Sequence, residues 1–150
     1  MKFEKLTKAD LKGKTDREMY LDQLSLPTRS TEGSCGYDFH SPSYYRIKPN
    51  EAVRIPLCVR VVDMPRDVAL FVYNRSGLSL NKGLTLDNGV GVIDSDYHDG
   101  IWFQATNHGK EPIEIGLNDR ICQGVFQRVV LMDDTPTNKR IGGLGSTGND

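Results

Sequence analysis

The chain has 150 residues, a formal net charge of −1 and 26% charged residues. A chain of this length fits one domain and can bury a core without disulfide or metal staples. The near-neutral charge leaves no broad basic surface, which disfavours nucleic acid and membrane as partners, so any phosphate binding must be local. The N-terminus lacks the apolar run of a signal peptide and no segment has the length of a membrane span, so we expect a cytoplasmic protein.

The cysteines and histidines show no metal-binding pattern. Cys35, Cys58 and Cys122 are odd in number and lack C-x-x-C spacing, as expected for reduced thiols in a reducing compartment. The three histidines show no H-x-x-x-H pairing either. We therefore predict no zinc site.

The first 25 residues differ from the rest of the chain in composition and in their lack of motifs. Lys2 to Leu6 is predicted to be an edge strand, and Thr15-Asp16 is a candidate N-cap for a short helix through Tyr20 and Leu24. The segment is rich in charged residues and carries no motif. We interpret it as a solvated appendage, with an added contact surface as the alternative.

Short strands are predicted to follow one another from residue 26 to residue 132. Ala52 to Val62 alternates apolar and polar side chains, as a half-buried strand does, and Pro56 places part of it at an edge or bulge. Further strands are predicted at Val68 to Tyr73, Val90 to Ile93, Ile101 to Thr106, Ile113 to Ile115 and Ile121 to Met132, with one helical turn at Ser76 to Asn81. Many short strands without a long amphipathic helix indicate an all-β barrel or jelly roll and disfavour a parallel doubly wound sheet.

The last thirty residues indicate that the protein forms an oligomer and that its C-terminal arm is mobile. Ile121 to Met132 is apolar on both faces, as a strand would be if another subunit covered its outer face. After Met132 only Ile141 and Leu144 are strongly apolar, so residues 133–150 cannot bury enough surface to hold themselves in place. We expect this arm to be mobile until something binds it.

The stretch from Asn88 to Gly100 has the composition of a site. Asp94 and Asp96 lie two residues apart, which in an extended chain puts both carboxylates on one face and Tyr97 on the other. Gly91 inside the preceding apolar run suggests a bulge or a close ligand. Aspartate-rich turns also close hairpins without any chemistry, and this stretch alone favours that structural interpretation.

Two further stretches can bind anions. Arg75-Ser76-Gly77 offers a guanidinium, a hydroxyl and an amide at a strand end, which suits phosphate oxygens; a capped turn with Arg75 in a salt bridge is the alternative. The stretch from Gly142 to Gly148 can present successive amides and two hydroxyls to an anion, although its composition alone favours a disordered terminus. It is not a Walker A loop because the G-K-[ST] ending is missing.

Five motifs occur in an order and spacing that resemble those of the trimeric dUTP pyrophosphatases (dUTPases). They are Cys35-Gly36-Tyr37-Asp38-Phe39, Arg75-Ser76-Gly77-Leu78, the stretch from Asn88 to Gly100, Asn118-Asp119-Arg120-Ile121-Cys122-Gln123, and Gly142 to Gly148. The resemblance covers roughly Leu26 to Gly148. It implies one domain with a distorted jelly-roll β-barrel over residues 26–132, a homotrimer, and a flexible glycine-rich arm over residues 133–150. Residues 1–25 remain as an N-terminal strand and an unmatched segment.

The resemblance also implies an activity. Family members hydrolyse dUTP to dUMP and pyrophosphate with Mg²⁺, which limits uracil incorporation into DNA and supplies dUMP for thymidylate synthesis. By resemblance, Asp94 would hold the attacking water, Asn88 would bond the uracil edge and Tyr97 would pack under the deoxyribose, while Asp96 looks structural. Asp38 would contact the waters on Mg²⁺, which fits the reluctance of this ion to shed water. The expected substrate-binding residues are Arg75, Ser76, Gly77, Asn88, Gly91, Val92, Ile93, Tyr97, Gln123, Arg140, Leu144, Gly145 and Ser146.

The arm departs from the family pattern. Leu144 stands where an aromatic residue is usual, and Lys139 stands five residues before it, where an arginine is usual. We predict that Arg140 reaches the phosphates through a one-residue shift, with Lys139 as the alternative. Cys35 replaces an alanine in the first motif, a small-for-small change.

Two other functions compete. Deoxycytidine triphosphate deaminases share the barrel, but the order Ile93-Asp94-Ser95-Asp96-Tyr97 favours the pyrophosphatase. The second is a regulatory binding protein whose nucleotide site switches a protein partner. The unmatched Met1 to Ser25 segment and the altered arm are its only support in the sequence.

Overall fold

The computed structural model describes residues 1–132 and Arg140. These residues form eleven strands and two short helices. The strands are β1 (Lys2–Lys5), β2 (Tyr37–His40), β3 (Tyr45–Ile47), β4 (Ala52–Pro56), β5 (Val59–Val62), β6 (Val68–Asn74), β7 (Leu84–Leu86), β8 (Gly91–Ile93), β9 (Trp102–Asn107), β10 (Ile113–Ile115) and β11 (Arg120–Arg128). The helices are α1 (Lys8–Leu11) and α2 (Ser76–Lys82).

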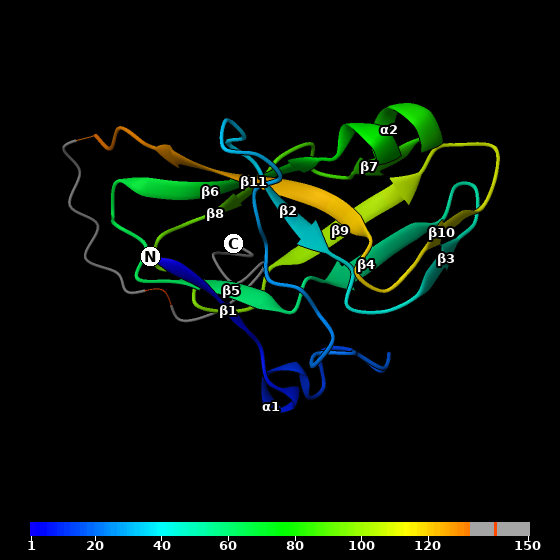
Figure 1. Ribbon diagram of the computed structural model, residues 1–150, viewed down its shortest axis with the longest axis horizontal. Coiled ribbons are helices and arrows are strands. Elements are labelled where there is room, and N and C mark those ends of the chain that lie inside the picture. Colours follow the sequence, from blue (N-terminus) through cyan, green and yellow to red (C-terminus); the bar gives the residue numbers. More distant parts are fainter. Residues whose placement is uncertain (133–139, 141–150) are drawn as a thin grey trace, which may run out of the picture.

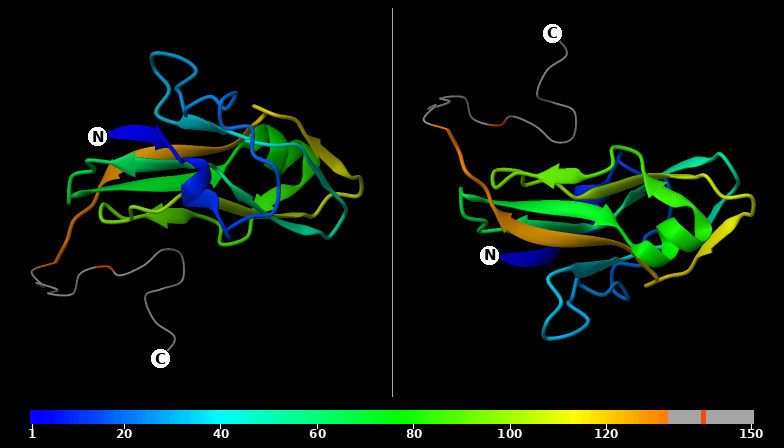
Figure 2. Two further views of the ribbon diagram at one scale, coloured as in Figure 1. Left: turned by 90° about the horizontal axis from the view of Figure 1, so that it is seen from below. Right: turned by 90° about the horizontal axis from the view of Figure 1, so that it is seen from above.

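All the strand pairs are antiparallel and form four small sheets. The largest has the order β2-β11-β6-β8, a second has the order β4-β9-β7, and β1-β5 and β3-β10 form two-stranded ribbons. The strands run along the length of a flattened barrel, with α1 below it beside β1 and α2 at the top beside β7 (Figures 1 and 2). The predicted all-β architecture is confirmed.

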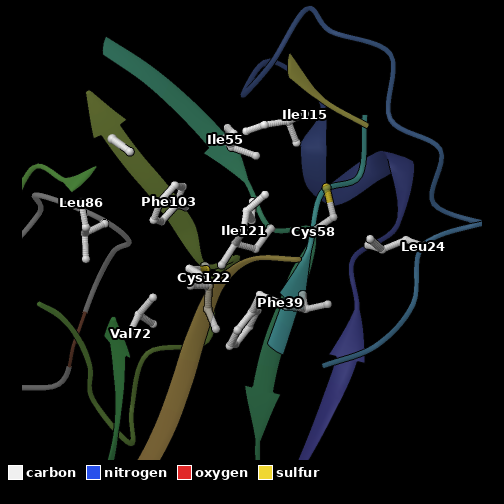
Figure 3. Close-up of a cluster of buried hydrophobic side chains, with 14 of the residues drawn as sticks. Leu24, Phe39, Ile55, Cys58, Val72, Leu86, Phe103, Ile115, Ile121 and Cys122 are labelled. Atoms are coloured by element: carbon white, nitrogen blue, oxygen red, sulfur yellow. The ribbon is translucent and has the colours of Figure 1, made fainter. Parts of the chain in front are cut away.

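The sheets enclose one core. Phe39, Phe103 and Ile121 come from three different strands and point toward one another (Figure 3), and each is 1% exposed. Burying an aromatic or aliphatic side chain of this size contributes roughly 1.5–3 kcal/mol. Gly124 permits the packing, because a Cβ there would lie 2.7 Å from Phe39 and 2.8 Å from Leu70.

The strand predicted over Ala52 to Val62 is two strands in different sheets. The chain turns at Cys58, whose φ of 56° lies in the left-handed region. The Leu57 amide donates to the Ile101 carbonyl, whereas the next strand, β5, leaves β9 and pairs with β1. Pro56 lies at the end of β4 and pairs with Trp102 of β9. Because β4 is an edge strand of its sheet, the predicted edge position of Pro56 is confirmed.

The N-terminal segment is not a solvated appendage. The edge strand is confirmed as β1, but Leu6, Leu11, Leu21 and Leu24 are buried in the core. The helix lies at Lys8–Leu11 and not after Thr15, because Thr7 and Asp10 close a capping box. A helix starting at Thr15 would need the Tyr20 amide, which donates instead to the Pro42 carbonyl at 2.9 Å.

Most of the other predicted elements lie close to their predicted bounds, whereas β2, β3 and β7 were not predicted. The predicted helical turn is α2, which ends where Gly83 takes a φ of 78° and its amide donates to Leu78 and Ser79. β11 ends at Arg128 and not at Met132, and the apolar Val130, Leu131 and Met132 that follow it are exposed. Neither α1 nor α2 is long enough to cross a membrane, and the described residues contain no other helix.

Candidate functional site

The larger sheet gathers one group of the predicted site residues. Gln123 of β11 pairs with Asp38 of β2 on one side and with Tyr73 of β6 on the other, and Arg75 follows the end of β6. Asp38, Arg75 and Gln123 border a hollow of about 520 Å³, which we call the anion hollow. It is lined by Ser30, Gly33, Ser34, Cys35, Gly36, Asp38, Arg75, Ser76, Gly77 and Gln123.

The anion hollow carries a cluster of charged groups centred on Asp38. Arg75 Nε donates to Asp38 Oδ1 at 3.3 Å, while Arg120 Nη1 and Ser30 Oγ donate to Oδ2 at 3.2 and 2.9 Å. Burial raises the pKa of Asp38, but the Ser30 hydroxyl and the two guanidinium groups outweigh it and hold the pKa below its ordinary value. The carboxylate is therefore ionised at neutral pH, and two guanidiniums against one carboxylate leave one positive charge that can attract an anion.

Gln123 lies across the hollow from a glycine. Its Nε2 donates to the Asn74 carbonyl at 3.2 Å, and a Cβ at Gly36 would lie only 2.8 Å from its Oε1. A larger residue at Gly36 would displace this side chain. Residue patterns alone gave Gln123 no role, and only the family resemblance assigned one.

The residues present fit a magnesium ion that is held mainly by a bound nucleotide. Among the described residues there is no group of three or more histidine, cysteine or acidic side chains that could hold a metal. In the described part of the chain, Asp38 is the one carboxylate that lines the anion hollow. Mg²⁺ keeps several waters and takes one or two carboxylates together with substrate phosphates, so a water-mediated contact to Asp38 suits this donor set.

The second group of predicted residues borders a smaller hollow beside β8. Asn88 lies in the turn between β7 and β8, and the turn closes where Gly89 takes a φ of 72°. The hollow measures about 200 Å³, and we call it the β8 hollow. Its lining comprises Arg54, Val72, Leu86, Asp87, Asn88, Gly91, Val92, Ile93, Tyr97, Trp102 and Gln104.

Sequence reasoning missed six residues of this lining, namely Arg54, Val72, Leu86, Asp87, Trp102 and Gln104, and three of them form a cluster. Trp102 and Gln104 lie two apart on β9, and Arg54 of β4 pairs with Gln104 and places its guanidinium 4.5 Å from the centre of the Trp102 ring. The period of two in β9 could have grouped Trp102 with Gln104. Nothing in the sequence shows that β4 pairs with β9 and brings Arg54 to them.

Tyr97 is held rigidly in the wall of the β8 hollow. Its ring is buried, its amide donates to the Asp94 carbonyl at 3.1 Å, and its hydroxyl donates to the Gly100 carbonyl at 2.9 Å. Burial, helped by the nearby Asp99 carboxylate, raises the pKa of the Tyr97 hydroxyl, which therefore stays protonated.

Asp94 and Asp96 stand in the open beside Tyr97. More than half of each side chain is exposed, and Arg140 bridges them: its Nη2 donates to Asp94 Oδ2, and its Nε donates to Asp96 Oδ1 at 2.9 Å. The Arg140 guanidinium also lies 5.5 Å from the centre of the Tyr97 ring. Lys139, Leu144, Gly145 and Ser146 lie outside the described residues.

Within residues 1–132 and Arg140, the two hollows share no lining residue. Ile93 of β8 pairs with Leu70 of β6, and Arg75 follows Leu70 by five residues. At about 3.3 Å per residue, Arg75 begins roughly 16 Å farther along the sheet than Ile93, the end of β8 that precedes Asp94. The other end of β8 is nearer, because Gly91 pairs with Val72, three residues before Arg75. Within one subunit, Asp94 therefore lies far along the sheet from Arg75.

The dUTPase family model matches residues 22–148. The chain belongs to the dUTPase family. It is 38% identical over 133 residues to the deoxyuridine 5'-triphosphate nucleotidohydrolase of Desulfitobacterium hafniense, which covers 82% of this chain and 87% of the relative. The corresponding protein of Lactococcus lactis subsp. lactis is 35% identical over 134 residues, covering 83% of this chain and 89% of the relative.

Solved dUTPase structures share the fold. The crystal structure of the dUTPase from Streptococcus mutans superposes with a TM-score of 0.70 at 28% identity and covers 88% of this chain and 98% of its own. A mutant dUTPase from phage phi11 of S. aureus, described with a structural Mg(II) ion, has a TM-score of 0.69 at 18% identity and covers 83% and 97% of the two chains. The predicted family and barrel are confirmed, and this family member carries 21 residues before the family match begins.

Proposed function

We propose that this family member hydrolyses dUTP to dUMP and pyrophosphate, which limits uracil incorporation into DNA and supplies dUMP for thymidylate synthesis. The observation that carries the proposal is the gathering of Arg75, Ser76 and Gln123 around one hollow, whose single carboxylate is paired with two guanidinium groups among the described residues. Such a hollow suits the phosphates of a nucleotide. The similar bacterial proteins are named for the same activity.

The β8 hollow would bind the base. β8 is the last strand of its sheet, so one edge of its backbone has no strand partner among the described residues. Gly91, Val92 and Ile93 can thus offer amide and carbonyl groups to the uracil edge, with the Asn88 side chain beside them. Cytosine would present the wrong donors and leave buried polar groups unpaired, which is how such a site rejects it.

Tyr97 would select the sugar. Because its ring is buried and its hydroxyl is tied to Gly100, the ring cannot swing away from the hollow. A deoxyribose would pack against the ring face, and a ribose 2'-hydroxyl would need the space that the ring fills. This arrangement supports selection of deoxyribonucleotides over ribonucleotides.

Asp94 would hold and polarise the water that attacks the α-phosphorus in line, with pyrophosphate leaving. Its side chain is more than half exposed, so a water can reach it. Arg75, Ser76 and Gln123 would bind the phosphate oxygens and stabilise the charge that develops in the transition state. Bound Mg²⁺ would neutralise phosphate charge, and Asp38 would hold its waters.

We infer that complete sites form between the subunits of a homotrimer. The separation of the two hollows supports this, since each would be half of a site. The exposed apolar residues Val130, Leu131 and Met132 give a neighbouring subunit something to cover. On substrate binding, Arg140 would exchange the carboxylates of Asp94 and Asp96 for phosphate oxygens, and Leu144, Gly145 and Ser146 would close the site.

The chemistry is tested by incubating the purified protein with dUTP, dCTP and UTP and identifying the products. We expect dUMP and pyrophosphate from dUTP, with little reaction of the other two. Ammonia release from dCTP would identify a deaminase instead. Excess chelator should stop the reaction, and full activity in its presence would exclude the Mg²⁺ role.

Two finer proposals concern the protein's surroundings. The cysteines Cys35, Cys58 and Cys122 are free, and this supports a reducing compartment such as the cytoplasm. A nucleotide-switched protein partner stays a prediction, supported by the 21 residues that precede the family match. Copurification of a partner that dUTP releases would support it, and its absence in a pull-down from the source cells would count against it.

A further inference from the structure

The segment that precedes the family match packs against the loop that carries Tyr97. Leu6 Cδ1 lies so close to Gly100 that a Cβ at this glycine would overlap it. Lys14 Nζ donates to Asp99 Oδ1 at 2.5 Å, joining residues that are 85 positions apart in the chain. Both contacts reach the two residues that end the stretch from Asn88 to Gly100.

A short chain of hydrogen bonds connects Lys14 to Tyr97. Asp99 Oδ1, which accepts from Lys14, also accepts from the Gly100 amide at 3.0 Å. The carbonyl of the same glycine accepts from the Tyr97 hydroxyl at 2.9 Å. Gly100 is therefore held at its amide by Asp99 and at its carbonyl by Tyr97, and Leu6 closes the space beside its Cα. The Lys14 contact is also the main reason that the pKa of Asp99 is lowered.

The N-terminal side of these contacts is itself anchored. The Leu6 amide donates to the Cys58 carbonyl at 2.9 Å, and the Lys14 amide donates to the Leu11 carbonyl at 3.0 Å. Leu11 is buried in the core, and Asp10 lies 3.8 Å from Arg60 of β5. Lys14 thus extends from a fixed base toward the Tyr97 loop.

We propose that residues 6–14 form an N-terminal brace for the Tyr97 loop, and that Lys14 and Asp99 are positioning residues that set the sugar selectivity of this dUTPase. The proposal rests on the role given to Tyr97 in the proposed function. Asp94 has an anchor of its own besides this loop, because Ile93 before it pairs with Leu70 of β6. Loss of the brace should therefore disturb sugar selection more than the chemical step.

The test compares Lys14→Ala and Asp99→Asn with the wild-type protein, using kcat and KM for dUTP and for UTP. The ratio of kcat/KM for dUTP to that for UTP should fall by up to about fivefold, as expected for loss of one partly exposed ion pair. Most of the change should appear as a higher KM for dUTP, with kcat nearly unchanged. Lys14→Arg, which keeps the positive charge beside Asp99, should keep most of the ratio.

Lys12→Ala is the matched control. Lys12 is an exposed lysine two residues from Lys14, and within the described part of the chain it makes no ion pair. Its removal should leave the dUTP to UTP ratio unchanged. Thermal unfolding of each variant shows that the proteins being compared are folded.

The outcomes distinguish failure of the brace proposal from failure of the proposed dUTP hydrolysis. An unchanged ratio in folded Lys14→Ala and Asp99→Asn overturns the brace, provided that the wild type hydrolyses dUTP and Tyr97→Ala lowers the ratio. Equal losses for dUTP and UTP that Lys14→Arg does not recover also overturn it, since they indicate general destabilisation. A wild-type protein that does not hydrolyse dUTP refutes the proposed function itself.

Discussion

Mixing two inactive variants tests whether each site takes its residues from two chains. Asp94→Asn removes the carboxylate proposed to hold water beside the β8 hollow, and Arg75→Ala removes a guanidinium from the anion hollow. Each variant alone should be nearly inactive. Refolded or expressed together, they would form mixed copies of the proposed homotrimer, in which one chain supplies Asp94 and its neighbour supplies Arg75.

The expected recovery follows from the separation of Asp94 from Arg75. Arg75 begins roughly 16 Å along the sheet from the end of β8 that precedes Asp94, so one bound nucleotide would meet the two residues in different chains. In an equimolar random mixture, half of the chains offer each intact residue, and about one quarter of the sites of a symmetric homo-oligomer then carry both. We expect close to one quarter of wild-type pyrophosphate release per subunit.

The assay needs differently tagged variants, so that mixed trimers can be isolated and their composition measured. The matched control mixes Asp94→Asn with Tyr97→Ala, two residues of the same loop. In that mixture every site keeps one of the two defects, so the activity should be no more than the mean of the parents. If the mixture of Asp94→Asn and Arg75→Ala gives only the mean activity of these two variants, although mixed trimers are present, then one chain builds the whole site.

Three other changes test single residues. Asp94→Asn should retain nucleotide binding but cut turnover by roughly 10² or more, because general-base contributions reach 10² to 10⁴; near-normal turnover would remove Asp94 from this role. Tyr97→Ala should lower the ratio of dUTP to UTP specificity constants, and an unchanged ratio would place sugar selection elsewhere. Asp38→Asn should lower the free energy of unfolding by about 1–3 kcal/mol at pH 7, since hydrogen bonds to charged groups are lost. The folded-state pKa of Asp38 is lowered, so its stabilisation is present above its ordinary pKa of about 4 and is lost as the pH falls through the folded value. Denaturant titrations at fixed protein concentration should show wild type and variant converging in acid, and a constant difference down to pH 2 would contradict this.

Much of the barrel could be predicted because its strands obey simple patterns. The strands at Val68 and Trp102 and the short helix at Ser76 lie within a residue or two of the predicted bounds. The break inside Ala52 to Val62 could not be predicted, because alternation continues through Cys58 while the backbone changes sheets there. A period of two reports which side chains are buried and not which strand is the neighbour.

The N-terminal helix was misplaced for a related reason. Thr7 and Thr15 are each followed three residues later by an acidic side chain, so both have the sequence of a capping box. Only Thr7 closes one, because a tertiary hydrogen bond from the Tyr20 amide to Pro42 takes away the amide that a second helix would use. Local signals ranked the two starts no better than evenly, and packing decided between them.

The anion hollow depends on a bulge that no residue pattern announces. Arg120 and Gln123 lie three apart, so a regular strand would turn them to opposite faces. Between them the register shifts: Arg120 pairs with His40 and Gln123 pairs with Asp38, two residues back on β2. The extra residue brings both side chains to the face that carries Asp38, where Arg120 joins Arg75. A chain with a net charge of −1 thereby gains a local positive site, and Arg120, which was not among the expected substrate-binding residues, supplies part of its charge.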